Sequence, residues 1–249
     1  MELIQDKVAV VTGAAAGIGF GVAKLFAEQG AHVFLSDING AQAKRAAASL
    51  QAAGGSVFGL EADARSRTAM AKVVDAAIQK FGRIDTLINN AGIYPRQSFL
   101  DMTEAQWDEI QDINLKSVFH CCQLVVPHMV RQGSGAIVNI SSVTFFLGFK
   151  SLTHYVASKS GIIGFTRSLA RELGEGNVRV NAITPGAIKT EGEVAVVTQE
   201  QADAMVELQS LKRRILPLDI ARVCLFLSSP LSGGMTGQTL NVDGGWVMH

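Results

Sequence analysis

The sequence predicts an α/β protein built on one doubly wound parallel sheet of about seven strands, with helices on both faces. Short apolar runs alternate with longer segments in which apolar residues recur at helical spacing, as expected for repeated strand–helix–strand units. The short runs are uniformly apolar, which is typical of strands that are covered on both faces. No linker-like tract, low-complexity segment or fixed-period repeat divides residues 1–249, so we expect a single domain.

The elements alternate regularly along the chain. Because parallel strands need a crossover, a helix is expected between each strand and the next, with right-handed connections. A ligand of such a sheet binds beyond the carboxyl ends of the strands. We expect strands at residues 8–11, 32–35, 56–60, 86–88, 136–140, 178–183 and 239–242, and helices near 17–29, 40–53, 66–81, 104–131, 154–174 and 218–229.

Composition argues against several classes of protein. Twenty-two basic and 22 acidic residues balance, which gives no electrostatic reason to expect nucleic acid or an anionic membrane as a partner. No apolar stretch reaches the ~18 residues of a membrane span, and charge in residues 1–7 argues against a signal peptide. The five histidines form no metal-binding cluster. The cysteines, expected to be reduced core residues of a cytoplasmic protein, are Cys121, Cys122 and Cys224.

A glycine-rich turn follows the first expected strand. Gly13, Gly17 and Gly19 lie in T-G-A-A-A-G-I-G, residues 12–19, directly before a helix. Glycines allow a tight turn and close backbone approach, and the helix start offers unpaired N–H groups and the positive end of its dipole to a pyrophosphate. An ordinary strand-to-helix turn is the alternative, but the position after the first strand favours a dinucleotide site.

An acidic residue ends the second expected strand. Asp37 lies eighteen residues after Gly19, close to where a carboxylate binds the adenosine ribose hydroxyls of a dinucleotide. A carboxylate there repels the 2′-phosphate of NADP, and the neighbours Ala16 and Ile38 carry no compensating charge. The alternative role, capping the helix near residue 40, can be filled by Asn39. We therefore predict NAD(H) rather than NADP(H).

One of only two tyrosines lies four residues before a lysine, in H-Y-V-A-S-K-S-G at residues 154–161. On a helix this spacing places Tyr155 and Lys159 on the same face. A surface pair on an amphipathic helix is the simpler interpretation of that motif alone.

Together these fragments resemble the short-chain dehydrogenase/reductase family over essentially the whole chain. The matching elements are T-G-A-A-A-G-I-G (12–19), Asp63, N-N-A-G (89–92), Asn114, Ser142, Y-V-A-S-K (155–159), P-G-A-I-K-T (185–190) and T-G-Q-T-L-N-V-D-G-G (236–245). The resemblance implies a Rossmann-type fold and hydride transfer between NAD(H) and a secondary alcohol or ketone.

The resemblance also implies roles for individual residues. Asp63 and Ala64 would contact the adenine. The residues expected beside the nicotinamide are Pro185, Gly186, Ile188 and Thr190. Ser142, thirteen positions before Tyr155, would hold the substrate oxygen, and Ser141 would be a strand-end hydrogen bonder. Asn114 would lie in a helix kink that holds a proton-relay water, although a satisfied core amide is an alternative. The expected cofactor-binding residues are Gly13, Gly17, Ile18, Gly19, Asp37, Ile38, Asp63, Ala64, Asn90, Ala91, Gly92, Tyr155, Lys159, Pro185, Gly186, Ile188 and Thr190.

The lysine then has a chemical role. Ionising a tyrosine near neutral pH requires lowering its pKa from about 10 to about 7.5, which takes roughly 3.4 kcal/mol. A unit positive charge about 5 Å away supplies roughly 3.3 kcal/mol at an effective dielectric constant near 20. We therefore expect Lys159 to lower the pKa of Tyr155, which acts as a general acid–base, and to bind the nicotinamide ribose.

The substrate is less well defined by the sequence. Aromatic residues in the loops after the fourth and fifth strands favour a moderately hydrophobic or aromatic alcohol or ketone, although they could equally pack under segment 190–215. A polyol or sugar acid is the alternative, because Arg96, Gln97 and His154 could reach polar groups. The expected substrate-binding residues are Ser142, Tyr155, Tyr94, Thr144 and Phe149, with Phe145 and Phe146 nearby.

Charged residues make up 18 % of the chain, below the roughly 25 % of ordinary domains, and the family resemblance suggests a homotetramer. Residues 104–131, 154–174 and the end of the chain, 246–249, would form its interfaces. Two other functions stay open: a 3-oxoacyl-(acyl-carrier-protein) reductase, and a non-catalytic NAD-binding sensor. The intact set of Asn114, Ser142, Tyr155 and Lys159 argues against the sensor.

Overall fold

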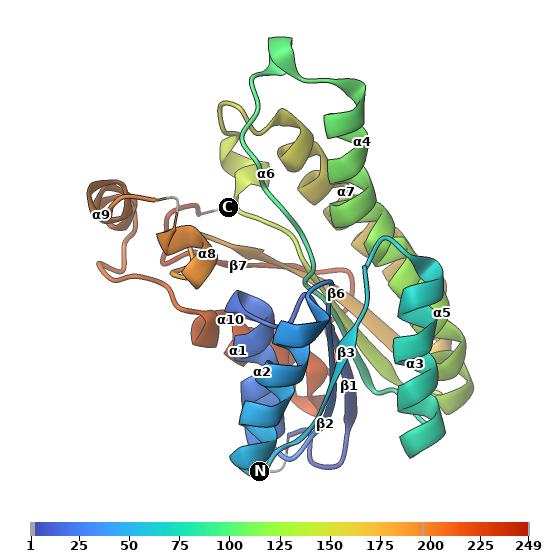
Figure 1. The fold of residues 1–249 in the computed structure, drawn as a ribbon. Coiled ribbons are helices and arrows are strands. Elements are labelled where there is room, and N and C mark those ends of the chain that lie inside the picture. The colour runs from blue at the N-terminus through green and yellow to red at the C-terminus, as the bar shows by residue number, and fades with distance from the viewer. Residues whose placement is uncertain (1–2, 196, 249) are drawn as a thin grey trace.

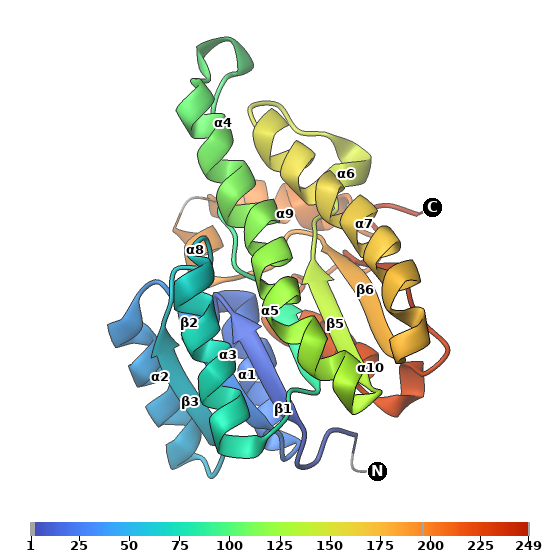
Figure 2. The same cartoon turned by 90° about the vertical axis from the view of Figure 1, so that its right-hand side faces the viewer.

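The computed structural model describes residues 3–195 and 197–248, and confirms the predicted fold class. Within these residues, seven strands form one parallel sheet in the order β3-β2-β1-β4-β5-β6-β7. The order reverses between β1 and β4, the switch point at which ligands bind in sheets of this kind. Helices cover both faces of the sheet (Figures 1 and 2). The expected domain and terminal interface include residues 1, 2 and 249, which lie outside the described residues.

The strands agree with the predicted ranges to within two residues at each end. Every neighbouring pair is parallel and in continuous register; Val10 of β1, for example, lies beside Phe34 of β2 and Leu87 of β4. The strands are β1 (Val8–Thr12), β2 (His32–Asp37), β3 (Ser56–Glu61), β4 (Thr86–Asn89), β5 (Gly135–Ile140), β6 (Val178–Pro185) and β7 (Thr239–Val242).

The helices form two layers. The first, α1 (Gly17–Glu28), α2 (Gly40–Ala52) and α10 (Pro217–Ser228), covers one face of the sheet, and α3 (Arg67–Phe81), α5 (Ser117–Gln132) and α7 (Thr153–Leu173) cover the other (Figure 1). The remaining helices lie beyond the carboxyl ends of the strands: α4 (Glu104–Gln111), α6 (Thr144–Leu147), α8 (Glu191–Val194) and α9 (Gln199–Glu207).

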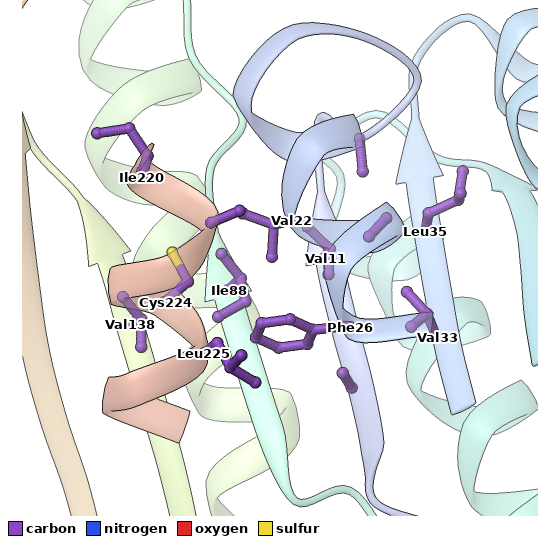
Figure 3. Close-up of a cluster of buried hydrophobic side chains, with 14 of the residues drawn as sticks. Val11, Val22, Phe26, Val33, Leu35, Ile88, Val138, Ile220, Cys224 and Leu225 are labelled. Atoms are coloured by element: carbon purple, nitrogen blue, oxygen red, sulfur yellow. The ribbon is translucent and has the colours of Figure 1, made fainter. Parts of the chain in front are cut away.

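The two hydrophobic cores explain why the strand sequences do not alternate. Ala9 and Val11 pack into the core beneath α1 and α10, whereas Val8 and Val10 pack into the opposite core. Successive side chains of a strand point to opposite faces, so a strand that is buried on both sides needs apolar residues throughout. In the first core, Phe26 of α1 lies between the sheet and α10 (Figure 3).

Three regions differ from the predicted elements, one of them the loop after β5, in which the short helix α6 forms. The single helix expected over 104–131 is interrupted by a π-helical turn at Asp112–Lys116, which separates α4 from α5. Segment 190–215, for which no helix was predicted, contains α8 and α9. The start of α9 has a sequence signal, because Thr198 and Gln201 form a capping box.

Three further observations concern the described part of the chain. Cys121, Cys122 and Cys224 are all buried, without a disulfide. No cluster of three or more potential metal ligands occurs among these residues. None of their helices combines the length and the apolar character needed to cross a bilayer.

Candidate active site

A cavity of about 340 Å³ opens beyond the carboxyl ends of the central strands. Its walls come from the turn before α1, the loops after β4, β5 and β6, the start of α7, and segment 190–215. The predicted residues that line it are Gly17, Ile18, Asn90, Gly92, Tyr94, Ser142, Thr144, Phe149, Tyr155, Lys159, Pro185, Gly186, Ile188 and Thr190. The cavity therefore brings together the residues expected at the nicotinamide and at the substrate.

The other predicted residues do not line this cavity. Gly13 and Gly19 belong to the glycine turn itself, Ala91 packs against Gly13, and Asn114 is fully buried beneath the loop after β4. The residues expected at the adenosine end follow β2 and β3: Asp37, Ile38, Asp63 and Ala64.

The glycine turn has the geometry of a phosphate-binding cradle. Gly13 and Gly17 adopt φ values of +60° and +58°, a region that favours glycine. A Cβ on Gly19 would lie 2.4 Å from the Gly13 carbonyl oxygen, so no larger residue fits there. The start of α1 has neither a side-chain cap nor an acidic residue in its first turn. The residues therefore fit a bound pyrophosphate. Its oxygens would accept hydrogen bonds from the unpaired backbone N–H groups at the start of α1, and its negative charge would lie at the positive end of the helix dipole.

Hydrogen bonds hold the turn against the loop after β4. The Asn90 amide donates to the carbonyl oxygens of Thr12 and Gly13, at 3.0 and 2.9 Å. In return, the backbone N–H groups of Asn90 and Ala91 donate to the Thr12 hydroxyl, at 3.0 and 3.1 Å. Asn90 and Ala91 thus connect the end of β1 to the end of β4. The next residue, Gly92, lines the cavity.

Asp37 is held at the end of β2 by the backbone. One carboxylate oxygen accepts the Ala15 N–H at 3.2 Å, and the other accepts the Asn39 N–H at 3.0 Å. Asn39, not Asp37, caps α2, by accepting the Gln42 N–H at 3.0 Å. The capping alternative for Asp37 is therefore wrong, and the carboxylate is free to accept further hydrogen bonds. Beside it, the Ile38 side chain is 63 % exposed.

Asp63 has a partner that the sequence analysis did not predict. Its carboxylate accepts hydrogen bonds from Arg65 Nε at 2.9 Å and Nη2 at 2.7 Å. The guanidinium lowers the pKa of Asp63. An adenine contact by Asp63 would therefore share the carboxylate with Arg65, and Ala64 lies between these two residues.

Tyr155 and Lys159 face the same cavity from α7, as their spacing predicts. The Lys159 ammonium lies 5.9 Å from the centre of the Tyr155 ring. Its Nζ donates to the Ile140 carbonyl oxygen at 2.8 Å, at the end of β5. Lys159 is 4 % exposed, so the surface-pair interpretation is wrong.

The expected effect on the tyrosine is not seen. Burial raises the pKa of Tyr155, the Ser142 hydroxyl lowers it, and Tyr94 raises it further. Burial also lowers the pKa of Lys159 to about 8. The prediction that Lys159 lowers the pKa of Tyr155 is therefore wrong for the protein alone. The reason is desolvation: burial opposes the charged form of both groups, an effect that spacing in the sequence does not reveal.

The two neighbouring serines have different environments. Ser141 Oγ donates to the Lys159 carbonyl oxygen at 2.7 Å, which agrees with a structural role. Ser142 Oγ accepts the Thr144 N–H at 3.2 Å and lies 3.0 Å from the Thr144 hydroxyl. Because a hydroxyl has one proton and two acceptor sites, Ser142 can still bind a substrate oxygen.

Asn114 lies in the π-helical turn and is completely buried. Its amide oxygen accepts the Ile93 N–H, and its amide nitrogen donates to the Ile93 carbonyl oxygen, both at 2.9 Å. The same nitrogen donates to Ser158 Oγ at 3.1 Å. The side chain is therefore a satisfied amide that holds the loop after β4 beside α7, and the predicted kink is present as the π turn.

The substrate side of the cavity is largely aromatic and aliphatic. Phe149 packs edge-on against Trp246, with ring centres 6.0 Å apart, and Tyr94 packs edge-on against Tyr155 at 6.2 Å. Trp246, which the sequence analysis placed at a subunit interface, lines this cavity. Phe145 and Phe146 instead line a separate hollow beside α7 and β7.

Of the polar residues considered for a sugar substrate, one reaches the cavity. Arg96 lines it, whereas His154 is buried elsewhere and Gln97 lies outside the lining. Sequence reasoning missed Glu193, Val197 and Met205, which come from segment 190–215. No motif marks these residues, because only the fold of α8 and α9 brings them over the site.

Comparison with known proteins agrees with this arrangement. A family model described as enoyl-(acyl carrier protein) reductase matches residues 13–247. A probable galactose dehydrogenase of Rhizobium meliloti is 42 % identical over 245 residues, covering 97 % of this chain and 95 % of that protein. A 3-oxoacyl-(acyl-carrier-protein) reductase of Thermotoga maritima is 39 % identical over 245 residues, covering 98 % and 99 %.

A third relative is also represented among solved structures. The 7α-hydroxysteroid dehydrogenase of Escherichia coli is 39 % identical over 246 residues, covering 99 % of this chain and 96 % of that protein. A structure of 7α-hydroxysteroid dehydrogenase with NADH and 7-oxo glycochenodeoxycholic acid has a TM-score of 0.95 and 38 % identity, covering 100 % of this chain and 97 % of the other.

The chain belongs to the short-chain dehydrogenase/reductase family, as the resemblance implied. It is an oxidoreductase that interconverts a CH–OH group and its carbonyl with a nicotinamide cofactor.

Proposed function

We propose that this enzyme transfers a hydride between NAD(H) and a moderately hydrophobic secondary alcohol or its ketone, with Tyr155 as general acid–base. The observation that carries this proposal is the convergence of Ser142, Tyr155 and Lys159 on one cavity that also meets the glycine turn. A hydroxyl, a phenol and a buried ammonium at one apolar cavity suit proton transfer to or from a reacting oxygen.

Each side chain then has a defined task. Ser142 binds the substrate oxygen, and Tyr155 takes the alcohol proton during oxidation or returns it during reduction. Lys159 binds the nicotinamide ribose and, once the cofactor is bound, stabilises the ionised phenol, while its hydrogen bond to Ile140 fixes its position. The nicotinamide, when bound, supplies the hydride acceptor and, in its oxidised form, additional positive charge beside the phenol. Asn114 is a positioning residue, because it holds Ile93 rather than the reacting atoms.

The raised pKa of Tyr155 restricts this mechanism. In the protein alone, the phenol is protonated at neutral pH, because burial raises its pKa. Oxidation of an alcohol needs the phenolate, so it should accelerate as the pH rises, whereas reduction of a ketone uses the phenol directly. We therefore expect alcohol oxidation to be fastest above neutral pH, and ketone reduction to be favoured near neutrality.

We propose NAD(H) rather than NADP(H) as the physiological cofactor. The support is the Asp37 carboxylate, which two backbone N–H groups hold at the end of β2, beside the uncharged Ile38. Such a carboxylate can accept hydrogen bonds from ribose hydroxyls and repels a 2′-phosphate. Faster turnover with NADPH than with NADH at matched concentrations would contradict this assignment.

The substrate proposal rests on Tyr94, Phe149 and Trp246, together with the aliphatic Val197 and Met205. An apolar body of several carbons would pack against these side chains. A 3-oxoacyl thioester is a second candidate, favoured by the 39 % identity to the Thermotoga maritima enzyme. Asp37, which has no basic neighbour in the sequence, argues against it, because the family resemblance implies that reductases of this kind usually prefer NADPH.

We also propose a cytoplasmic homotetramer. The low charged fraction supports further buried surface, as do the exposed apolar side chains of α4 and α5, among them Trp107, Phe119 and Val130. Buried cysteines without disulfides are compatible with a reducing compartment. Sedimentation of a monomer at micromolar concentration would contradict the assembly.

An absorbance screen tests the proposed function. NADH formation is followed with aryl and alkyl secondary alcohols, polyols and hydroxyacids, and NADH consumption with a 3-oxoacyl thioester. We expect the highest kcat/KM with hydrophobic secondary alcohols. Exclusive activity with polyols, or with the thioester and NADPH, would overturn the substrate proposal.

A further inference from the structure

One acidic residue lies among the residues that line the mostly apolar substrate side of the cavity. Glu193 of α8 is 9 % exposed, and it is among the residues that line the cavity. One oxygen, Oε1, accepts a hydrogen bond from Arg214 Nη2. The other, Oε2, is buried and has no hydrogen-bond partner within residues 3–195 and 197–248, and the same holds for Arg214 Nε.

The backbone fixes the position of this carboxylate. Thr190 caps α8, with the Glu193 N–H donating to its hydroxyl at 3.1 Å. On the other side, Ile215 forms a parallel bridge with Ile188, and the Lys189 N–H donates to the Ile215 carbonyl oxygen at 2.9 Å. These contacts bring Arg214 and Glu193 together. The carboxylate is therefore held over the cavity by protein contacts alone.

An ion pair that only holds α8 to the residues before Ile215 would explain Glu193 Oε1 and Arg214 Nη2, but it leaves both Glu193 Oε2 and Arg214 Nε without a partner. A buried polar atom without a partner costs free energy, and charged groups cost more. Val197, Met205 and Trp246, which share this side of the cavity, offer apolar side chains to a ligand. The unpaired oxygen therefore favours a ligand that carries a hydrogen-bond donor.

The charge of Glu193 acts across the cavity. Besides burial, it is the second cause that raises the pKa of Tyr94, which lines the same cavity. A negative charge there disfavours anionic ligands. It favours neutral ligands with an O–H group, because a hydrogen bond to a charged acceptor is stronger than one to a neutral acceptor.

We propose that Glu193 is a specificity-determining residue whose Oε2 accepts a hydrogen bond from a second, non-reacting hydroxyl of the substrate. The substrate is then a neutral alcohol or ketone with an apolar body and a hydroxyl remote from the reacting carbon. This inference rests on the proposed function and narrows its substrate class.

A matched series of ligands tests the inference. The ligands are linear diols from pentanediol to nonanediol, each with one secondary and one primary terminal hydroxyl, and the corresponding ethers in which the primary hydroxyl is methylated. Oxidation of each pair is compared in the wild type, Glu193→Gln and Arg214→Gln. Glutamine keeps the size of the side chain, but it presents an N–H₂ group where the free oxygen was. The Arg214 variant removes the ion pair and leaves Glu193 as an acceptor.

We expect one chain length at which the wild type prefers the diol to its ether. In Glu193→Gln, the ratio of kcat/KM for diol over ether should fall about tenfold or more, mainly through KM, whereas Arg214→Gln should retain a preference for the diol. Equal losses for diol and ether in both variants would overturn the inference and leave a purely structural ion pair. No preference for the diol at any length in the wild type would also overturn it.

A binding measurement separates this inference from the proposed function. Calorimetric titration of the same diol and ether into the NADH complex requires no turnover. Tighter binding of the diol that is lost in Glu193→Gln supports the inference even if no alcohol of the series is oxidised, an outcome that would contradict the proposed function alone. Equal binding of diol and ether by the wild type and by Glu193→Gln overturns the inference.

Discussion

The Lys159 ammonium lies 5.9 Å from the centre of the Tyr155 ring and donates at 2.8 Å to the Ile140 carbonyl oxygen. The lysine therefore faces the phenol while the end of β5 holds it in place. Burial opposes charge on both groups: it raises the pKa of Tyr155 and lowers that of Lys159 to about 8. The surroundings of Tyr155 and Lys159 thus disfavour the charged form of each side chain. The protonation of both groups therefore depends on the charges of what binds beside them.

Replacing Lys159 with Met should stabilise the cofactor-free protein at neutral pH while abolishing turnover. The pKa of Lys159 falls from 10.5 in the unfolded chain to about 8 when folded, so the buried ammonium costs up to about 3 kcal/mol at 1.36 kcal/mol per pKa unit. Between these two values the unfolded chain binds more protons, and the stability of the wild type therefore rises with pH.

Chemical denaturation at pH 7 and near pH 10 measures this effect. We expect the advantage of Lys159→Met to shrink between the two, because the wild type gains stability over that window. Lys116→Met, which removes an exposed ammonium from the surface, should change the free energy of unfolding by less than about 0.5 kcal/mol. An advantage of Lys159→Met that grew with pH would contradict the lowered pKa of Lys159.

The double substitution Asp37→Ser, Ile38→Arg should shift cofactor preference toward NADP(H). It removes a carboxylate that can bind ribose hydroxyls and adds a cation that can bind the 2′-phosphate. Because hydrogen bonds to charged groups contribute roughly 1.5–3 kcal/mol, the kcat/KM ratio of NADP over NAD should rise at least about tenfold. Steady-state kinetics with both cofactors measure that ratio.

Glu61→Gln is the matched control for this cofactor prediction. Glu61 is exposed and lies beside Asp37 in the register of β2 and β3, so its removal subtracts a neighbouring charge without the proposed ribose contact. An equal shift in preference from Glu61→Gln would mean that general electrostatics, not Asp37, selects the cofactor.

Gly19→Ala should weaken NADH binding strongly, because the added Cβ would lie 2.4 Å from the Gly13 carbonyl oxygen and 2.6 Å from the Asn90 amide nitrogen. Relief of that clash displaces the glycine turn from the loop after β4. NADH titration by fluorescence should show at least about a tenfold weaker Kd, consistent with the loss of one or two charge-assisted hydrogen bonds.

Gly174→Ala provides the comparison for the glycine turn. Gly174 has right-handed helical φ and ψ of −56° and −42°, and a Cβ there meets nothing within 4 Å. Alanine should therefore leave the Kd for NADH unchanged. If Gly19→Ala bound NADH as tightly as Gly174→Ala does, the turn would not be the pyrophosphate site.

The sequence predicted the fold well because the central strands β1, β4, β5 and β6 are buried on both faces. Uniform apolar runs such as Val8–Val11, alternating with helical segments, are typical of a parallel sheet that helices cover on both faces, so both the strands and their parallel order could be inferred. The residues at the chemistry were predictable for a related reason. Gly13, Tyr155 and Lys159 lie in short motifs whose spacing directly determines their geometry.

Features that depend on distant contacts escaped prediction. Trp246 lines the cavity although it lies near the end of the chain, and Glu193 lies at the site because Ile215 bridges to Ile188. The pKa of Tyr155 also depends on burial, which no spacing reveals. The positions of residues in segment 190–215 depend on how α8 and α9 pack, which no motif in the sequence marks.

Pre-steady-state turnover of Tyr155→Phe is the measurement that tests the central claim most directly. The variant keeps the ring but removes the only group proposed to exchange the substrate proton, so hydride transfer should slow by at least about a hundredfold, while the Kd for NADH stays within about threefold of the wild type. A Tyr155→Phe enzyme that formed NADH at more than a few per cent of the wild-type rate would show that tyrosine is not the acid–base of this site.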